Sequence, residues 1–462
     1  MKISLTHRQE DSRRLMHCIL LFFFALGLRL LYANSVLEQF VELSAADQTS
    51  NKMGYLTPDS PGYLEPALNL MKGHIAQAVS LTRPIGYPAF LALVRANPTT
   101  ILYVQASLLS LIPVCTFLLV TVLTDNNLLG FAAGLLSSIS PSGIAIGSLV
   151  MSDALFAALF AVLFTAMVYG TLRNSPAWIL FSAVVSGLAI LVKPILLFWP
   201  VVAVMVSALI AAFQDGSRNG LRRWLPIDKG RRTQMLVLFF VPTVFMTSWA
   251  AVNYAENGIF TLSIIGDLTL REYLATRTEE WGMAGHLPSD VAVHQNQNIL
   301  RKRLETLPAQ ERAHAYLSES MAIFKKYPTQ AIKTFVEDAR ENALDGWDYF
   351  PRQLPFSQQK LGRVFERLSG LEYRLRKVAL LMIFFAPFIG LFTVRVNPSP
   401  YERRLVSILF AMMLTFLCFL TSSGTTFWTG PRILYPAEIL EISATAMLVN
   451  TLYRSWNASE CT

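Results

Sequence analysis

Ten apolar segments dominate the sequence, and each is long enough to form a membrane-spanning helix. A helix of about 20 residues crosses the roughly 30 Å hydrocarbon core of a bilayer. The sequence therefore predicts an all-α polytopic membrane protein with about ten transmembrane helices. The segments lie at residues 15–33, 101–123, 128–148, 153–172, 176–193, 195–213, 234–252, 378–394, 405–422 and 433–453.

The composition excludes an ordinary soluble domain. Of the 462 residues, 53% are hydrophobic and 15% are charged, and the mean hydropathy is +0.42. The net charge of +8 would suggest a nucleic-acid ligand in a soluble protein, but here the cations stand in short loops, where they set topology. We therefore expect no nucleic-acid partner. The four cysteines are scattered and indicate neither a metal cluster nor a disulfide framework.

The distribution of Lys and Arg predicts that both ends of the chain lie inside. With the N-terminus inside, the inner loops and the C-terminal tail hold one, six, three and one Lys or Arg, at Arg173, 218–232, 395–404 and Arg454. We expect the first segment to be a retained anchor rather than a cleaved signal, because it is 19 residues long and contains Arg29, which can snorkel outward.

This topology divides the chain into three parts. Residues 1–252 form a membrane module whose first outer loop is 34–100, and residues 378–462 form C-terminal membrane helices. Residues 253–377 form an outer domain.

The outer domain is expected to be helical. Capping Ser or Pro residues begin three predicted helices, Ser289–Glu305, Pro308–Lys325 and Pro328–Asp345. Gln358–Leu368 is amphipathic and is expected to lie on the outer membrane surface before the next span.

The first outer loop concentrates chemistry-bearing residues between Thr57 and Val94. Asp59 stands in a Pro- and Gly-bracketed turn at the start of a predicted helix, and Tyr63, Arg83 and Tyr87 follow. A carboxylate in this position can deprotonate a hydroxyl or hold a divalent cation. Alternatively, it only complements the helix dipole, which is worth about 0.3–1 kcal/mol.

Two isolated charges stand at the expected outer ends of spans. Asp153 is the sole charged residue between Asp125 and Arg173, and Lys193 is the sole one between Arg173 and Asp215. A charge at the membrane centre costs roughly 2.5–3.5 kcal/mol, so such residues usually have a partner or a task. The plainer interpretation is a first-turn acid for Asp153 and a snorkelling cation for Lys193.

The first loop resembles that of the GT-C glycosyltransferases. The resemblance is to the branch that contains protein O-mannosyltransferases and the lipid A aminoarabinose transferase (glycosyltransferase family 39). It rests on the patterns Asp-Ser-x-x-Tyr, Ala-x-Asn-Leu-x-x-Gly and Arg-Pro-x-Gly-Tyr-Pro, with matches at Asp59, Ser60, Tyr63, Ala67, Asn69, Leu70, Gly73, Arg83, Pro84, Gly86, Tyr87 and Pro88.

Weaker similarities to the same family occur elsewhere. Met-Ser-Asp153 is similar to the family's second acidic position, and Lys193-Pro194 stands where relatives carry Arg-Pro or Lys-Pro. Arg432 and Tyr435 resemble an Arg-Tyr pair that opens the last span, although Arg432 could instead be an interfacial anchor. Asn253, Gly258 and Ser263 resemble the exit toward the outer domain.

The resemblance implies transfer of a sugar from a polyprenyl-phosphate donor to a glycan, lipid or protein acceptor on the outer face, with inversion. Asp59 is the expected base, and Asp153 is the second catalytic carboxylate. The resemblance also implies a substrate-binding set of Tyr63, Arg83, Tyr87, Lys193, Arg432 and Tyr435.

A divalent cation bridging Asp59 and Asp153 is an open alternative, although His74 and His286 form no recognisable ligand spacing. The sequence has no Asp-x-Asp and no Rossmann-type glycine pattern, which favours a lipid-linked donor over a nucleotide sugar.

Two other classes also fit the apolar spans. A transporter or flippase of lipid-linked sugars explains the sparse charges, but not the crowded first loop or the large outer domain. An O-antigen polymerase or ligase is expected to rely on arginines and a later loop. The compact loops favour a bacterial inner membrane, with the site facing the periplasm.

Overall fold

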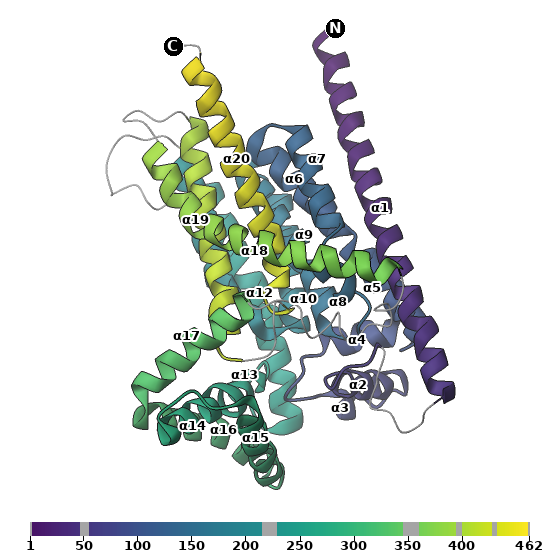
Figure 1. Cartoon of the computed structure of the whole chain (residues 1–462), viewed down its shortest axis with the longest axis vertical. Helices are drawn as coiled ribbons and strands as arrows, with labels where there is room; N and C mark the ends of the chain where they lie inside the picture. Colours follow the sequence, from purple (N-terminus) through teal and green to yellow (C-terminus); the bar gives the residue numbers. More distant parts are fainter. Residues whose placement is uncertain are drawn as a thin grey trace.

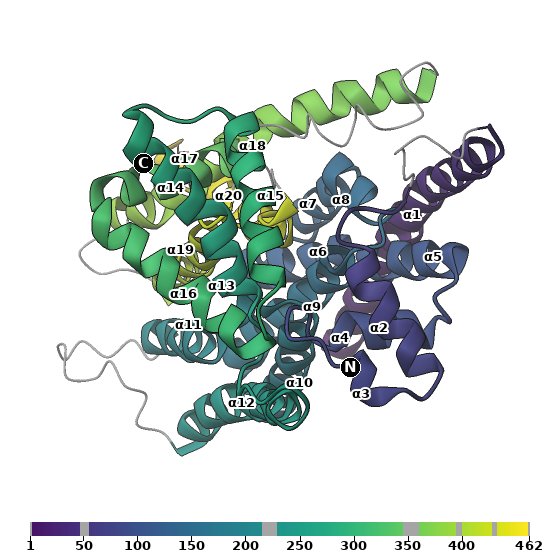
Figure 2. The same ribbon diagram turned by 90° about the horizontal axis from the view of Figure 1, so that it is seen from below.

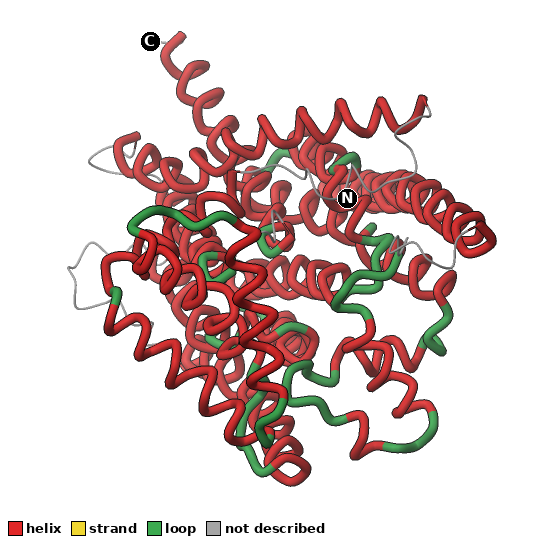
Figure 3. The backbone as a smooth tube through the Cα atoms, turned by 60° about the horizontal axis from the view of Figure 1, so that its bottom comes forward, coloured by secondary structure: helices red, strands yellow, loops and turns green. Residues whose placement is uncertain are grey.

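The computed structural model describes residues 2–46, 55–214, 229–344, 360–393, 400–426 and 432–460. Within these ranges the chain is helical, and the tube in Figure 3 shows no strand. The fold class predicted from the sequence is therefore confirmed as a helical one.

In the described part of the predicted membrane module, eleven α-helices precede helix α12, Lys229–Asn257. Their bounds are α1 Lys2–Ala46, α2 Pro61–Met71, α3 Ile75–Ala78, α4 Gly86–Leu93, α5 Pro98–Leu109, α6 Leu111–Thr124, α7 Asn127–Ser138, α8 Pro141–Ile146, α9 Ser152–Arg173, α10 Pro176–Val192 and α11 Trp199–Gln214. Helix α12 leads out of the module.

The outer domain and the C-terminal part follow. Their helices are α13 Ile265–Thr269, the π-helical turn η3 Leu270–Ala275, α14 Thr276–Ala284, α15 Asp290–Glu305, α16 Ala309–Lys326, α17 Pro328–Leu344, α18 Lys360–Thr393, α19 Pro400–Ser423 and α20 Glu438–Glu460, the last preceded by the short turn η7 Tyr435–Ala437. The three helices predicted in the outer domain are present as α15, α16 and α17.

Five helical stretches in the described ranges have the length and apolar composition to cross a membrane. They are Glu10–Glu38, Pro98–Thr124, Ser152–Arg173, Lys229–Asn257 and Leu405–Ser423. Asn127–Ser138, Pro176–Val192 and Trp199–Ala211 are shorter apolar helices. The count of ten spans stays a prediction.

One predicted segment is broken. Residues 128–148 include most of α7 and the short α8, because α7 ends at Ser138, Ser140 caps the start of α8, and Pro141 occupies the first helical position of α8. Helix α7 has 12 residues, which span only about 18 Å. The expectation of one membrane-spanning helix at 128–148 is therefore wrong.

Helix α9 lies at the centre of the bundle. Its face carries Phe156, Phe160 and Phe164, whose stacked rings meet Trp199 of α11 and Phe419 of α19. Residues are buried along the whole length of α9, from Ser152 to Thr171. A polar residue at either end of α9 is thus held by the packing of the whole helix.

The outer loop and the outer domain lie at one end of the bundle, and the two chain ends lie at the other (Figure 1). Seen from below in Figure 2, helices α2–α4 lie beside the helices of the outer domain. A small apolar core joins the two parts through Leu81, Ile264, Leu300, Leu304 and Tyr316. We call residues 258–344 the cap domain.

The amphipathic segment predicted at Gln358–Leu368 is the start of α18, although residues 358 and 359 lie outside the described ranges. This part of α18 lies across the upright helices in Figure 1. Val364 is exposed, whereas the ring of Phe365 stacks on Tyr32 of α1.

Arg29 does not snorkel, contrary to the expectation from the sequence. Its side chain is 1% exposed and donates to the carbonyl oxygens of Ala25 and Ser138, at 3.2 and 3.4 Å. The neighbouring helices cover it, so this charge is held inside the protein.

Gly86 allows α4 to touch the end of α10 directly. A Cβ there would lie 2.6 Å from the carbonyl carbon and oxygen of Leu191 and 2.7 Å from the backbone nitrogen of Val192. No side chain can move aside, because the opposing atoms are backbone. The glycine therefore fixes the first loop against the residues that precede Lys193.

We predict that Gly86→Ala destabilises the protein by about 1–3 kcal/mol, the usual cost of forcing an extra group into a packed site. Thermal unfolding of the purified protein in detergent measures the effect. Gly266→Ala is the control, because a Cβ at Gly266 meets nothing within 4 Å. Equal melting temperatures for the two variants would contradict the assigned contact.

The predicted topology can be tested by introducing one cysteine at a time into a variant from which the four native cysteines have been removed. His286 is exposed in the cap domain, and Lys229 is exposed at the start of α12. In right-side-out vesicles, a membrane-impermeant thiol reagent should label His286→Cys at once and Lys229→Cys only after permeabilisation. Immediate labelling at position 229 would reverse the predicted orientation.

Candidate functional site

Asp59 occupies the turn that precedes α2. The hydroxyl of Ser60 accepts from the backbone N–H of Thr57 at 2.8 Å and donates to the carbonyl oxygen of Val150 at 2.9 Å. These bonds fix the turn against the segment that leads into α9. The side chain of Asp59 remains 30% exposed, which leaves it accessible.

Two arginines hold the carboxylate of Asp59. One oxygen lies 2.8 Å from Arg83, and the other lies 3.1 Å from Arg432. The carboxylate thus binds side chains from distant parts of the chain. This geometry favours a site role over a charge that only complements the dipole of α2.

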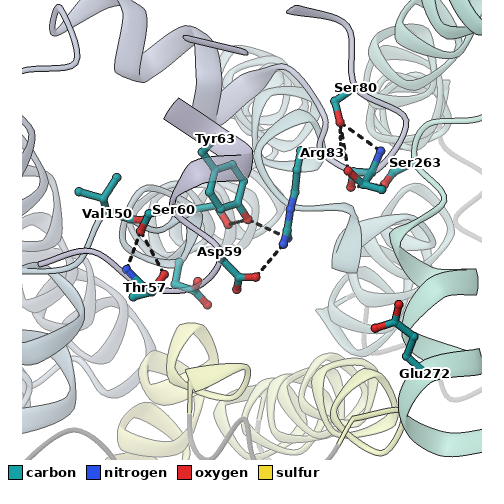
Figure 4. A network of polar contacts seen from close by, with 12 residues as sticks. Thr57, Asp59, Ser60, Tyr63, Ser80, Arg83, Val150, Ser263 and Glu272 are labelled. Carbon is teal, nitrogen blue, oxygen red and sulfur yellow. Dashed lines mark hydrogen bonds and ion pairs between the residues drawn. The ribbon is translucent and has the colours of Figure 1, made fainter. Parts of the chain in front are cut away.

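Arg83 is itself oriented by Tyr63. The guanidinium donates to the Tyr63 hydroxyl at 3.1 Å and lies 4.8 Å from the centre of its ring. The same hydroxyl is 2.9 Å from that of Ser152, the first residue of α9. Figure 4 shows the Arg83 guanidinium facing both Asp59 and Tyr63, with Glu272 of the cap domain in the same view.

Arg432 also reaches Asp153. Its Nε lies 3.4 Å from a carboxylate oxygen of Asp153, and the same oxygen is 2.5 Å from the ammonium of Lys193. Lys193 terminates α10 in an extended conformation before Pro194, as expected for a residue that precedes proline. The two isolated charges noted in the sequence are therefore partners.

The five charged groups form one continuous chain of alternating sign: Arg83, Asp59, Arg432, Asp153 and Lys193. We call it the outer charge chain. Three cations and two carboxylates leave a net charge of +1. Asp153 is 2% exposed, whereas Arg83 and Arg432 are 21% and 24% exposed. The accessible part of the chain is thus Asp59 with its two arginines.

The arginines keep Asp59 ionised. Burial alone would raise the pKa of its carboxyl, but the charges of Arg432 and Arg83 outweigh burial and hold the pKa below its ordinary value. Without a ligand, Asp59 is therefore a weak base. Any anion that draws the arginines away will strengthen it.

Tyr87 and Tyr435, both predicted to bind substrate, are buried. Tyr87 is 0% exposed and donates to Gln105 at 2.6 Å. Gln105 in turn donates to the carbonyl oxygens of Gly147 and Leu149, at 3.1 and 2.8 Å. Tyr435 is 2% exposed. Neither side chain offers surface to a substrate in this structure, so direct contact is not supported.

A metal ion bridging Asp59 and Asp153 does not fit this arrangement, because Arg432 stands between the two carboxylates and contacts both. No group of three or more His, Cys, Asp or Glu suited to a metal occurs in the described ranges. Neither His74 nor His286 completes such a group.

The cap domain lies against the first loop and contains one buried acid, Glu272, that the sequence analysis missed. The Ser263 hydroxyl donates to the carbonyl oxygen of Thr82 at 2.8 Å, which fixes the cap domain next to Arg83. In the turn η3, Glu272 is 2% exposed and pairs with Arg301 at 2.6 Å. In the sequence, Glu272 and Arg301 are two charges 29 residues apart within a polar region. Such a pair cannot be told from the many other charged residues around it.

No protein-family model matches the chain, and no curated protein does. Among solved structures, the chain is similar to the archaeal oligosaccharyltransferase AglB from Archaeoglobus fulgidus in complex with an inhibitory peptide and a dolichol-phosphate, at 12% identity and a TM-score of 0.45. The match covers 97% of this chain and 52% of that chain. A similarity this low assigns neither fold nor function. The long apolar helices of the chain are the observation that indicates a helical membrane protein.

We predict that Lys193→Met destabilises the protein by roughly 3–5 kcal/mol, because it removes the closest partner of a buried carboxylate. Adding Asp153→Asn should recover most of this loss, since the amide needs no counter-ion. Thermal unfolding measures both, with the exposed Lys229→Met as the control. A double variant as unstable as the single one would contradict the pairing.

Proposed function

We propose that the protein is a glycosyltransferase of the GT-C type that moves a sugar from a polyprenyl-phosphate donor to an acceptor on the outer face of the membrane. The observation that carries this proposal is the outer charge chain. It joins Asp59 and Arg83 of the first-loop motif to Asp153, Lys193 and Arg432, which the sequence places far apart.

The charge balance supports an anionic donor. The chain has one cation in excess, and Arg83 and Arg432 are its accessible guanidiniums. Guanidinium groups bind phosphate oxygens in a fixed, often bidentate geometry. A donor phosphate near these arginines would complete the charge balance and stabilise the negative charge that the phosphate gains on leaving.

Arrival of the phosphate would also activate Asp59. If the arginines turn toward the phosphate, the carboxylate loses the charges that hold its pKa down. Asp59 then accepts the proton of the acceptor hydroxyl while the hydroxyl oxygen bonds to the anomeric carbon. The bond from that carbon to the phosphate oxygen breaks, and the phosphate departs with the electron pair. A single displacement of this kind inverts the anomeric centre.

An apolar pocket supports a lipid-linked donor. A pocket of about 330 Å³ opens between α10 and α12, close in sequence to Lys193. Its wall is apolar apart from one serine and consists of Leu191, Val244, Phe245, Ser248, Trp249 and Val252. A pocket with this lining could hold part of a prenyl chain.

The central test is Asp59→Asn, which keeps the shape of the side chain and removes the base. Transfer from a polyprenyl-phosphate sugar should fall by at least ~100-fold, the scale of a missing general base. Donor binding should persist, because Arg83 and Arg432 remain. Glu65→Gln, on the exposed face of α2, is the matched control. Retention of more than about a tenth of the activity would contradict the role of Asp59 as base.

The Lys193→Met/Asp153→Asn variant separates a binding role of Lys193 from its structural one. If Lys193 contacts the donor phosphate, this variant should fold normally and still need about tenfold more donor for half-maximal rate. An unchanged donor dependence would leave Arg83 and Arg432 to hold the phosphate. If the purified protein instead moves lipid-linked sugar across vesicles without transferring it, the transporter interpretation replaces ours.

A further inference from the structure

A second polar cluster lies where α8, α18 and α20 meet. Glu372 of α18 and Glu438 of α20 both approach the hydroxyl of Ser140, the residue that caps α8. Glu372 also accepts from the backbone N–H of Ser142 at 3.0 Å. None of these residues belongs to the outer charge chain.

The Ser140 hydroxyl has two carboxyl neighbours but only one proton to donate, so one of the two contacts needs a proton from the carboxyl group. Its oxygen lies 2.7 Å from Glu438 and 3.3 Å from Glu372. It also accepts from the backbone N–H of Gly143 at 3.3 Å. A hydroxyl has one proton to donate, and the shorter contact assigns it to Glu438. The contact with Glu372 is then a hydrogen bond only if that carboxyl group carries a proton.

Glu372 has the geometry of a neutral acid. One of its oxygens, Oε2, accepts from the N–H of Ser142, and the other, Oε1, faces the Ser140 hydroxyl. A protonated carboxyl group has one accepting and one donating oxygen, which matches these two neighbours. Glu438 instead faces two hydroxyl donors, of Ser140 and of Ser137 at 2.7 and 3.4 Å, as suits a carboxylate.

The charges around the cluster also favour a neutral Glu372. Besides the two glutamates, Glu441 of α20 and Arg376 of α18 face each other at 3.8 Å. Arg29 of α1 also reaches the cluster, because its guanidinium and the Tyr435 hydroxyl both crowd Gly143 of α8. With Glu372 neutral, two carboxylates balance two guanidiniums. With Glu372 ionised, the cluster carries an uncompensated negative charge.

We propose that Glu372 is held as a neutral carboxylic acid and acts as a positioning residue that joins α18 to the start of α8. Helix α8 leads directly into the segment 147–151, which precedes Asp153. Glu438, on the far side of the same serine, follows Arg432 by six residues. The hydrogen bonds of Glu372 and Glu438 to Ser140 and Ser142 therefore set the distance between Arg432 and Asp153.

The protonation state is tested without any assay of function. Infrared spectroscopy of the purified protein should show the C=O stretching band of a protonated carboxylic acid at neutral pH, and Glu372→Gln should remove it. Persistence of the band in Glu372→Gln, its loss only in Glu438→Gln, or its absence from the unchanged protein would each overturn the proposal.

The positioning role is tested by transfer activity and so rests on the proposed function. Gln reproduces the donor and acceptor of a neutral acid, so Glu372→Gln should retain activity within about twofold. Glu372→Leu should lower kcat by ~10-fold or more, since small misplacements in a site are costly. Glu366→Leu, at an exposed position of α18, is the control.

The two tests fail in distinguishable ways. If no variant or wild-type protein transfers sugar, the proposed function fails, while the infrared result still decides the state of Glu372. If Glu372→Gln loses as much activity as Glu372→Leu, an ionised carboxylate is required and the proposal is wrong. If Glu372→Leu is fully active, Glu372 positions nothing that the reaction uses.

Discussion

The burial of Asp153 at the head of α9 is the constraint on which the site depends. A carboxylate that is 2% exposed among apolar helices is stable only with close cations, and Lys193 and Arg432 supply them. Each cation comes from a different part of the chain, at the end of α10 and just before α20. Satisfying one buried charge therefore brings three distant segments to the same point, and Arg432 then extends the chain outward to Asp59.

The buried carboxylate of Asp153 and the partly exposed carboxylate of Asp59 therefore differ in what they can bind. Asp153 is enclosed by its partners, so its contribution is to hold Lys193 and Arg432. Asp59 is 30% exposed, so its two arginines can also be reached by a ligand. In the proposed reaction, a donor phosphate would compete with Asp59 for these arginines, and the same competition would turn a weakly basic carboxylate into a stronger base. One pair of guanidiniums would then link donor binding to activation of the proposed base.

The sequence predicted the helices and part of the site because both leave local signals. Prolines and capping residues marked α15, α16 and α17, and the isolation of Asp153 and Lys193 within apolar sequence indicated that each has a partner or a task. It did not reveal that Arg29 is buried, because burial depends on what packs beside the side chain. The break in the segment 128–148 had a local signal in Ser140 and Pro141, but the apolar residues on both sides of it predicted a single span. The first-loop motif singled out Tyr87, but whether a tyrosine faces a ligand or Gln105 is set by tertiary packing. Glu438 and Glu441 stand at the start of an apolar segment, a signal that would have indicated the second cluster.

The two polar clusters share one short segment of the chain. Arg432 closes the outer charge chain, and Glu438, six residues later, binds the cap of α8. Between them, the turn η7 buries Tyr435 against Gly143, where a Cβ would lie 2.4 Å from the phenol oxygen. The phenol oxygen thus occupies the space that a side chain at position 143 would fill, and a movement of α8 relative to α20 would disturb the packing of η7 between Arg432 and Glu438. In the proposed arrangement, α18 holds α8 through Glu372 and is thereby coupled to the geometry of the candidate site, although the charge chain includes no described residue of α18.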